Sequence, residues 1–326
     1  MKQTKRILSL LLCLLLVATL ACACTKQPEK EKEPEQVETQ PTADPNAPLC
    51  DGKTLKLLAI TSSFGLNTTE LLYAIAKAEG VETVIVGRLY ASGCTLQQHV
   101  EAVKTGSNFY QYTKFTDESN GQRVLMEGIP LKYGLKDEDW DIIFVQQGAA
   151  YAPIASSYGT YLDELMPYLQ ENKTNPNARF VWNMTWAYQG NSDQKVFVQN
   201  FNSDQMAMYE SILSATKEKI VPRTDFAAII PTGTAVQNAR TSYFGDTLTK
   251  DTYHLNNLGR AIAGYTLFSI LTGKELTQVN LGPVNCYDLP QNLELSDSDR
   301  QVIIESVNNA IKNPWEVTPS AFTEKP

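Results

Sequence analysis

The sequence has few histidines and cysteines for its length. Its 326 residues include two histidines, His99 and His254, and six cysteines. Six cysteines are too few for a disulfide scaffold in a chain of this size. The sequence has no Cys-x₂-Cys pair and no His-x₃-His pair, so it does not indicate a metal site. With two histidines, a general base that works near neutral pH has very few candidates.

Positive charge is also scarce. Lysine and arginine total 28 against 36 acidic residues, which gives a net charge of −8. This balance argues against a nucleic-acid-binding surface. The sequence contains neither a Gly-x-Gly-x-x-Gly loop nor a Gly-x₄-Gly-Lys-Ser/Thr loop, so no nucleotide cofactor is indicated. We expect no cofactor, no metal and no nucleic-acid partner.

The first residues form an export signal rather than part of a domain. Lys2, Lys5 and Arg6 precede an apolar run over residues 7–20, which is too short for a lasting membrane span. The run ends at Cys22 and Cys24, and a small residue precedes each of them. This pattern resembles the lipobox of bacterial lipoproteins, in which the cysteine is lipidated. An ordinary secretory signal with two incidental cysteines is the alternative.

The chain is therefore expected to consist of a signal, a tether and one domain. Residues 1–21 are the predicted signal peptide. Residues 22–50 are rich in proline, glutamate and lysine, and they are expected to act as a lipid anchor and an extended tether. Residues 51–320 form the predicted domain and residues 321–326 a tail. The resemblance to lipoproteins implies a domain displayed at the bacterial cell surface, with the membrane contacted only through the lipid.

The predicted domain alternates between short apolar strands and helices. The strands are expected at residues 55–60, 83–87, 141–145, 179–183 and 226–230, and residues 109–116 and 122–127 are expected to form a hairpin insert. Helices are expected after a cap at Asn67 and at residues 96–104, 161–172, 203–220, 255–271 and 296–312. This order predicts a three-layer α/β/α sandwich around a central, mainly parallel five-stranded sheet.

The residues that follow these strands carry the chemistry of acyl transfer. Ser62 and Ser63 follow the first strand, Gly93 comes after the second, and Gln147 comes after the third. Asp251 and His254 lie shortly before the helix at 255–271. Such sheets bind ligands beyond the carboxyl ends of their strands. A serine attacks, a histidine takes its proton and a carboxylate orients that histidine. Asp-x-x-His is also a common capping turn.

The combined pattern resembles the SGNH (GDSL-type) hydrolases, and within them an uncharacterised bacterial lipoprotein branch. The resemblance covers most of the domain and rests on five blocks: Ala59-Ile60-Thr61-Ser62-Ser63-Phe64, Ser92-Gly93-Cys94-Thr95-Leu96, Gln146-Gln147, Met184-Thr185-Trp186-Ala187-Tyr188 and Asp251-Thr252-Tyr253-His254-Leu255. The segment Pro231–Arg240 also resembles that branch. The resemblance implies a flavodoxin-like SGNH fold.

The resemblance also implies roles for individual residues. Ser63 is the implied nucleophile, His254 the base and Asp251 its orienting carboxylate. The backbone N–H groups of Ser63 and Gly93 are the implied oxyanion donors. The third donor is implied to be the amide of Gln147, with Asn183 as the competing candidate.

Two positions depart from the usual SGNH pattern. The block that usually reads Gly-Asn-Ser or Gly-Asp-Ser is Thr61-Ser62-Ser63 here, and the usual glycine after the catalytic aspartate is Thr252. Neither change removes a reactive group, but both bear on the shape of the pocket. A descendant that binds without catalysis is therefore the alternative.

Three further residues are candidate substrate contacts. His99, Trp186 and Arg240 lie near strand ends or in the matching blocks, although a buried histidine, a packing aromatic and an ion pair are the simpler interpretations. Cys50 and Cys286 lie outside the blocks, and the sequence leaves open whether they pair.

The expected function is that of a serine esterase. The Ser-His-Asp residues are expected to hydrolyse a small ester, with acetate on a carbohydrate as the favoured substrate class. The alternative is an inactive surface lipoprotein that binds a glycan or another ligand in the same cleft. We expect the protein to be a monomer.

Overall fold

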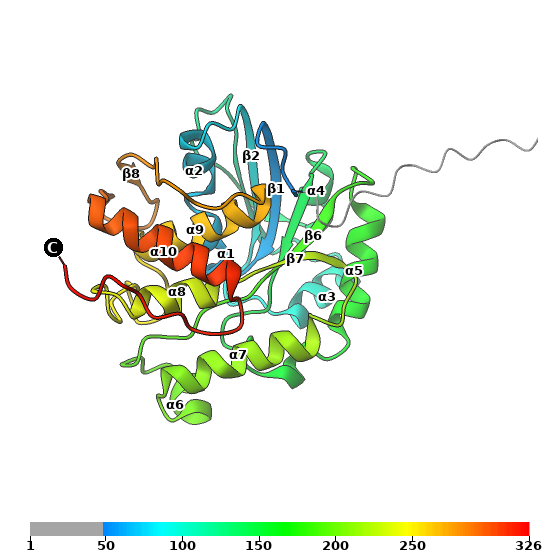
Figure 1. The fold of residues 1–326 in the computed structure, drawn as a ribbon. Coiled ribbons are helices and arrows are strands. Elements are labelled where there is room, and N and C mark those ends of the chain that lie inside the picture. The colour runs from blue at the N-terminus through cyan, green and yellow to red at the C-terminus, as the bar shows by residue number, and fades with distance from the viewer. Residues whose placement is uncertain (1–47, 326) are drawn as a thin grey trace, which may run out of the picture. The chain divides into compact units, whose positions relative to one another are not determined.

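A seven-stranded sheet lies at the centre of the fold in the computed structural model, which describes residues 48–325 (Figure 1). Its strand order is β4-β3-β2-β1-β5-β6-β7. The strands are β1 (Thr54–Thr61), β2 (Thr83–Tyr90), β3 (Tyr110–Phe115), β4 (Val124–Ile129), β5 (Ile142–Val145), β6 (Arg179–Asn183) and β7 (Phe226–Ile230). The predicted signal, Cys22, Cys24 and most of the tether lie outside the described residues.

The predicted five parallel strands are confirmed, but the predicted number of strands was wrong. β2, β1, β5, β6 and β7 pair in parallel, and the hairpin β3–β4 extends the same sheet antiparallel to β2. The hairpin was expected as an insert, without a place in the sheet. It joins because the free edge of β2 presents backbone groups that need hydrogen-bond partners.

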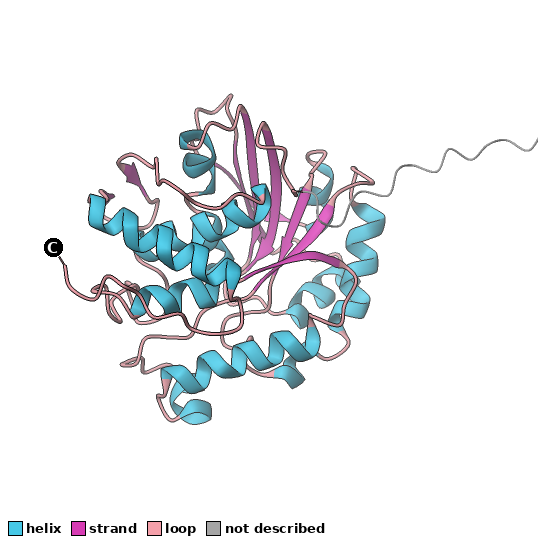
Figure 2. Ribbon diagram, in the orientation of Figure 1, coloured by secondary structure: helices cyan, strands magenta, loops and turns pink. Residues whose placement is uncertain are grey.

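Both faces of the central strands β1 and β5 are buried, which explains their mainly apolar sequences, whereas β4 at the edge is exposed. Along β1, Leu57 and Ala59 belong to the core on one face, whereas Leu58 and Ile60 belong to the core on the other. Figure 2 shows helices on both sides of the sheet. The three-layer α/β/α architecture is therefore confirmed.

Most of the predicted helices are present, but the helices at residues 131–136, 195–201 and 232–240 were not predicted. They are α1 (Ser63–Thr69), α2 (Leu72–Ala78), α3 (Leu96–Thr105), α4 (Leu131–Lys136), α5 (Tyr161–Asn172), α6 (Lys195–Phe201), α7 (Gln205–Lys219), α8 (Thr232–Arg240), α9 (Asn257–Thr272) and α10 (Asp297–Lys312), with a 3₁₀ turn η1 (Ala155–Tyr158). A separate antiparallel pair joins β8 (Val284–Asn285) and β9 (Asn292–Leu293). Within residues 48–325, no helix combines the length and hydropathy required to cross a membrane.

Three predicted helix starts were wrong. Asn67 does not cap a helix: it lies inside α1, and its side chain accepts a hydrogen bond from the backbone N–H of Leu255. The helix predicted at 203–220 begins at Gln205 instead, because Asp204 caps it. The helix predicted from residue 255 starts at Asn257 under an Asn256 cap, which leaves His254 in the preceding loop.

The ends of the described unit are tied to its core. The carbonyl of Pro48 accepts a hydrogen bond from Arg179, and the N–H of Cys50 donates to the carbonyl of Leu271. At the other end, the N–H of Tyr243 donates to the carbonyl of Phe322. Pro48, Cys50 and Phe322 are therefore bonded to the domain predicted at residues 51–320.

Candidate functional site

Asp251 and His254 form a bonded pair in the loop before α9. Asp251 Oδ2 lies 2.7 Å from His254 Nδ1, and Asp251 Oδ1 accepts the backbone N–H of His254 at 2.8 Å. An isolated antiparallel bridge between Thr249 and Leu255 closes this loop. The carboxylate thus holds the imidazole by its Nδ1 side, so that Nε2 is left for proton transfer.

The same bonds keep the carboxylate of Asp251 charged. Partial burial raises the pKa of Asp251, but the hydrogen bonds from the His254 ring and backbone more than offset this, and the net pKa lies below its ordinary value. The side chain of His254 is 18% exposed and that of Asp251 is 39% exposed. The pair is therefore accessible from solvent, and the carboxylate of Asp251 carries a negative charge.

Ser63 is the first residue of α1. The start of this helix packs against residues 249–255, which carry His254 and are called the histidine loop here. The ring of the adjacent Phe64 meets the His254 ring edge-on, with 5.9 Å between centroids. One turn later, Asn67 Oδ1 accepts the N–H of Leu255 at 2.8 Å. These two contacts bring the start of α1 and the histidine loop together at the carboxyl edge of the sheet, where Ser63 is half-buried.

Ser62 is held in a buried polar chain beneath this edge. It is 1% exposed, and its hydroxyl accepts a hydrogen bond from Gln146 Nε2 at 3.1 Å. Gln146 Oε1 in turn accepts from Asn183 Nδ2 at 2.9 Å, and Asn183 Oδ1 accepts from Thr232 at 2.7 Å. Of the two serines that follow β1, Ser63 is therefore the more accessible hydroxyl.

The two candidate amides for the oxyanion site are both committed elsewhere. Gln147 Nε2 donates to the carbonyl and the hydroxyl of Ser157, and its Oε1 accepts from the backbone N–H groups of Leu96 and Gly148. Asn183 Nδ2 donates to Thr68 and Gln146. Each side chain is 1% exposed. In this arrangement the N–H groups of both amides are engaged in other bonds, and the role of Gln147 as an oxyanion donor stays a prediction.

Gln147 supports the turn that carries Gly93. By accepting the N–H of Leu96 at 2.9 Å, it ties the start of α3 to the end of β5. Gly93 itself is exposed, has a φ of +62° and has open space beside its Cα. Gly148 packs so close to this turn that an added Cβ would lie 2.8 Å from the carbonyl oxygen of Cys94. The backbone N–H of Gly93 thus belongs to a turn that is held in place by the hydrogen bond from Leu96 to Gln147 and by close packing against Gly148.

A family model described as a domain of unknown function, DUF4886, matches residues 56–289. The chain belongs to the DUF4886 family. A crystal structure of a DUF4886 family protein from Bacteroides uniformis is 34% identical, with a TM-score of 0.71, and covers 82% of this chain and 98% of its own.

Two further solved structures are more distant. One is described as "a putative SGNH hydrolase" from Slackia heliotrinireducens, at 16% identity and a TM-score of 0.41, covering 68% of this chain and 100% of its own. The other is described as "a putative GDSL-like lipase" from Parabacteroides merdae, at 14% identity and a TM-score of 0.42, covering 68% and 97%. A search of curated proteins finds no match to this chain.

The two departures from the expected pattern behave differently in this DUF4886 protein. Thr61 ends β1 without a left-handed backbone, and its hydroxyl fills the space beside Gly65, where a Cβ would lie 1.8 Å away. Thr252 has a φ of +72°, a conformation that a β-branched residue rarely adopts. Its carbonyl accepts the N–H of Gln189, and its hydroxyl donates to Ser192. Neither departure displaces the Asp251–His254 pair.

His99 and Trp186 are both buried in the core of this DUF4886 protein. His99 is fully buried, with Nδ1 2.7 Å from the hydroxyl of Tyr110. Trp186 is also fully buried: its ring stacks on Phe64 at 4.1 Å, and its Nε1 donates to the carbonyl of Tyr253. Both side chains are enclosed by protein, and their predicted contacts with a substrate stay predictions. Trp186 thus supports the site, since it contacts Phe64 and Tyr253, which adjoin Ser63 and His254 in the sequence.

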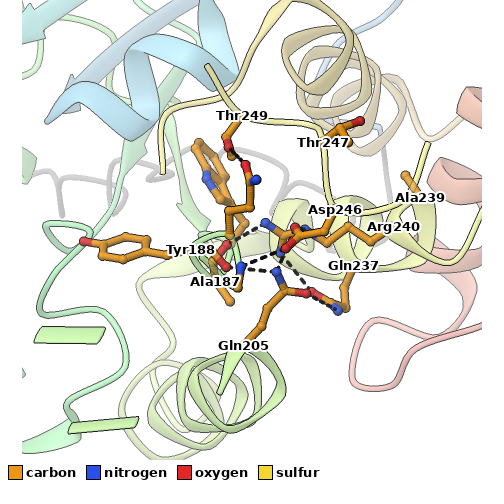
Figure 3. A network of polar contacts seen from close by, with 12 residues as sticks. Ala187, Tyr188, Gln205, Gln237, Ala239, Arg240, Asp246, Thr247 and Thr249 are labelled. Carbon is orange, nitrogen blue, oxygen red and sulfur yellow. Dashed lines mark hydrogen bonds and ion pairs between the residues drawn. The ribbon is translucent and has the colours of Figure 1, made fainter. Parts of the chain in front are cut away.

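Arg240 belongs to a polar network, shown in Figure 3, that holds together the loops behind the histidine. Its guanidinium lies 3.0 Å from Asp246 and donates to the carbonyl of Ala187 and to Gln237. Asp246 also accepts from Gln205 and from the N–H of Gly190. Burial lowers the pKa of Arg240 to about 10, although Asp246 acts in the opposite direction. The ion-pair interpretation of Arg240 therefore agrees with the structure, and a substrate contact by this residue stays a prediction.

The cysteines and acids of the described residues form neither a disulfide nor a metal cluster. Cys50, Cys94 and Cys286 are free buried thiols, so Cys50 and Cys286 do not pair. Residues 48–325 contain no group of three or more His, Cys, Asp or Glu side chains placed to hold a metal ion.

Sequence reasoning missed the residues that hold the site from behind. Gln146, Phe64 and Asn67 each contact a candidate catalytic segment, but all three lie beside residues with a more obvious role. Of these residues, only Gln146 could have been found from the sequence, because it stands next to Gln147. Successive residues at a strand end point to opposite sides, so Gln146 and Gln147 had to serve different partners.

Proposed function

We propose that this protein is a serine ester hydrolase in which Ser63 is the nucleophile, His254 the general base and Asp251 the residue that orients His254. The observation that carries the proposal is the Asp251–His254 pair, bonded at 2.7 Å and packed against the helix that begins at Ser63. The likeness of its sequence blocks to the SGNH hydrolases supports the same assignment.

The chemistry follows from these three side chains. Ser63 Oγ attacks the ester carbonyl carbon while its proton passes to His254 Nε2, and Asp251 stabilises the imidazolium that forms. The N–H groups of Ser63 and Gly93 hold the oxyanion. The C–O bond to the alcohol breaks as His254 returns the proton to the leaving oxygen. Water then attacks the acyl-serine, again through His254, and releases the acid and free Ser63.

The proposed substrate is a small acyl ester, with acetate on a carbohydrate as the favoured class. One observation favours the binding-only alternative: the amides of Gln147 and Asn183 are both engaged in other bonds. An oxyanion would then rely on backbone donors alone. Each donor in such a site contributes roughly 3–4 kcal/mol of transition-state stabilisation.

Hydrolysis of p-nitrophenyl acetate by the purified protein tests the proposal. We expect Ser63→Ala and His254→Ala to lower kcat/KM by about 1,000-fold or more, because the two groups act as a unit. Ser62→Ala serves as the matched control and should retain most of the activity, because its hydroxyl is bound by Gln146. A folded wild-type protein as inactive as both variants would favour the binding-only function.

We also propose that the protein is exported and anchored by a lipid on Cys22 or Cys24, as a monomer on the cell surface. The basic start, the apolar run at 7–20 and the small residues before both cysteines support this. Metabolic labelling with a radioactive fatty acid should mark the full-length chain. Replacing both cysteines should abolish the label, and replacing each one singly identifies the modified residue.

A further inference from the structure

A cleft of about 500 Å³ lies between the start of α3 and the loop that follows β5. Gly93, whose N–H is a proposed oxyanion donor, forms part of its lining. The opposite wall comes from residues 151–161, which include the η1 turn. Whatever occupies this cleft would therefore lie beside the reacting carbonyl of a bound ester.

The lining of the cleft is polar and carries no positive charge. Hydroxyl and amide groups come from Thr95, Gln97, Gln98, Ser156, Ser157 and Tyr161, and its only charged side chain is the carboxylate of Glu101, which accepts a hydrogen bond from Gln97. Without lysine, arginine or histidine in the lining, the cleft is poorly suited to a phosphate or carboxylate. It also lacks aliphatic side chains, so it does not suit a long acyl chain. The lining matches a neutral ligand that is rich in hydroxyl groups.

Tyr151 adds an exposed aromatic surface to one wall. Its side chain is 47% exposed although it lines the cleft. The backbone beneath it is firmly bonded, since the N–H groups of Tyr151 and Ala152 both donate to the carbonyl of Gly148 at 2.9 Å. Ser157 Oγ donates to the carbonyl of Tyr151 and accepts from Gln147. The ring is thus carried on an ordered loop, which lowers the entropic cost of stacking a ligand against it.

We propose that this cleft binds the sugar that bears the ester, with one sugar ring stacked on Tyr151. Its hydroxyls would bond to Gln97 Oε1 and Gln98 Nε2, because the other amide atoms of these side chains already bond to Glu101 and Thr95. The proposal rests on the proposed esterase function, because it assigns the cleft to the alcohol portion of the substrate. The geometry then presents the acyl group to Ser63 past Gly93. The ligand class is a neutral, acetylated saccharide rather than a fatty-acid ester.

The test compares two ester substrates in matched variants of the full chain. Acetylated xylotetraose contains the sugar and p-nitrophenyl acetate does not. We expect Tyr151→Ala to lower kcat/KM for acetylated xylotetraose at least 10-fold more than for p-nitrophenyl acetate, whereas Tyr151→Phe should restore it. Tyr133→Ala is the matched control, since this tyrosine is 38% exposed and lies on α4, outside the cleft lining.

Binding measurements separate the failure of this proposal from the failure of the esterase function. Calorimetric titration of Ser63→Ala with acetylated xylotetraose should show binding that the double variant with Tyr151→Ala loses. Binding without wild-type turnover of either ester would overturn the esterase function and keep the cleft as a sugar site. Turnover of p-nitrophenyl acetate with equal effects of Tyr151→Ala on both substrates would overturn the sugar site alone. A preference for p-nitrophenyl decanoate over the acetate would do the same.

Discussion

His99 shows how one buried side chain can set the pH dependence of the whole domain. Burial lowers its pKa from 6.5 to about 4, and its ring stacks on Tyr110 with 5.7 Å between centroids. The unfolded chain therefore takes up a proton near pH 6.5 that the folded chain refuses until about pH 4. Stability is thus fully present above pH 7 and falls as the pH drops through this window.

We expect the free energy of unfolding to fall by about 2 kcal/mol between pH 7 and pH 5 because of His99 alone. Urea denaturation at the two pH values measures this loss. His99→Gln should remove most of the difference between the two pH values, although it lowers stability at pH 7. An unchanged pH dependence in this variant would mean that other groups are responsible.

Thr252 is the residue whose backbone the loop strains most directly. At a φ of +72°, its side chain crowds its own backbone, whereas glycine adopts this conformation freely. We expect Thr252→Gly to raise the free energy of unfolding by roughly 0.5–1 kcal/mol. Thr249→Gly, in the same loop, should instead lower it. A loss of stability in Thr252→Gly would show that its hydroxyl bond to Ser192 outweighs the strain.

Among the elements, the strands were the most predictable part of the fold. β5 is a continuous apolar run, and β1 and β6 are mainly apolar, because both of their faces are buried, and this pattern needs no knowledge of the rest of the chain. The hairpin β3–β4 was visible as two strands, but its attachment to β2 depends on a long-range pairing. Asn67 looked like a helix cap, but its actual partner, Leu255, is far away in the sequence.

In the candidate site too, local contacts were predictable and contacts between distant segments were not. The local pair Asp251–His254 was predictable from its spacing, because both of its bonds lie within one turn of the chain. The role of Gln147 was not, because Leu96 and Ser157 approach it from two other segments. A sequence shows which residues are available for chemistry, but the partners that occupy their hydrogen bonds are set by tertiary packing.

The loop that carries His254 depends on the Arg240–Asp246 pair at its start. The guanidinium is almost fully buried, so loss of the carboxylate would leave a charge with too little compensation. We expect Asp246→Asn to lower the free energy of unfolding by roughly 2 kcal/mol, a figure reduced from that of a fully buried pair because Asp246 is partly exposed. Glu218→Gln, which breaks the surface pair with Lys219, should cost less than about 0.5 kcal/mol.

At the scale of the whole molecule, the core is completed by a segment that lies beyond the family match. The match ends at residue 289, yet α10 and the strand-free segment after it cover α8, all nine residues of which are buried (Figure 1). Thr318 N–H donates to Asn238 in α8, and Thr234 in the same helix donates to the carbonyl of Pro314. Trp315, Val317 and Phe322 pack against the core.

Because α8 follows β7 directly and ends at Arg240, uncovering it should disturb both the core and the histidine loop. We expect deletion of residues 314–326 to lower the free energy of unfolding by about 3 kcal/mol or more, since it removes three apolar side chains and the bonds to α8. Deletion of Lys325 and Pro326 alone is the control and should change little. Thermal denaturation measures both, and the hydrolysis of p-nitrophenyl acetate shows whether the site fails with the fold. If the longer deletion left stability unchanged, the segment would be an appendage rather than part of the domain.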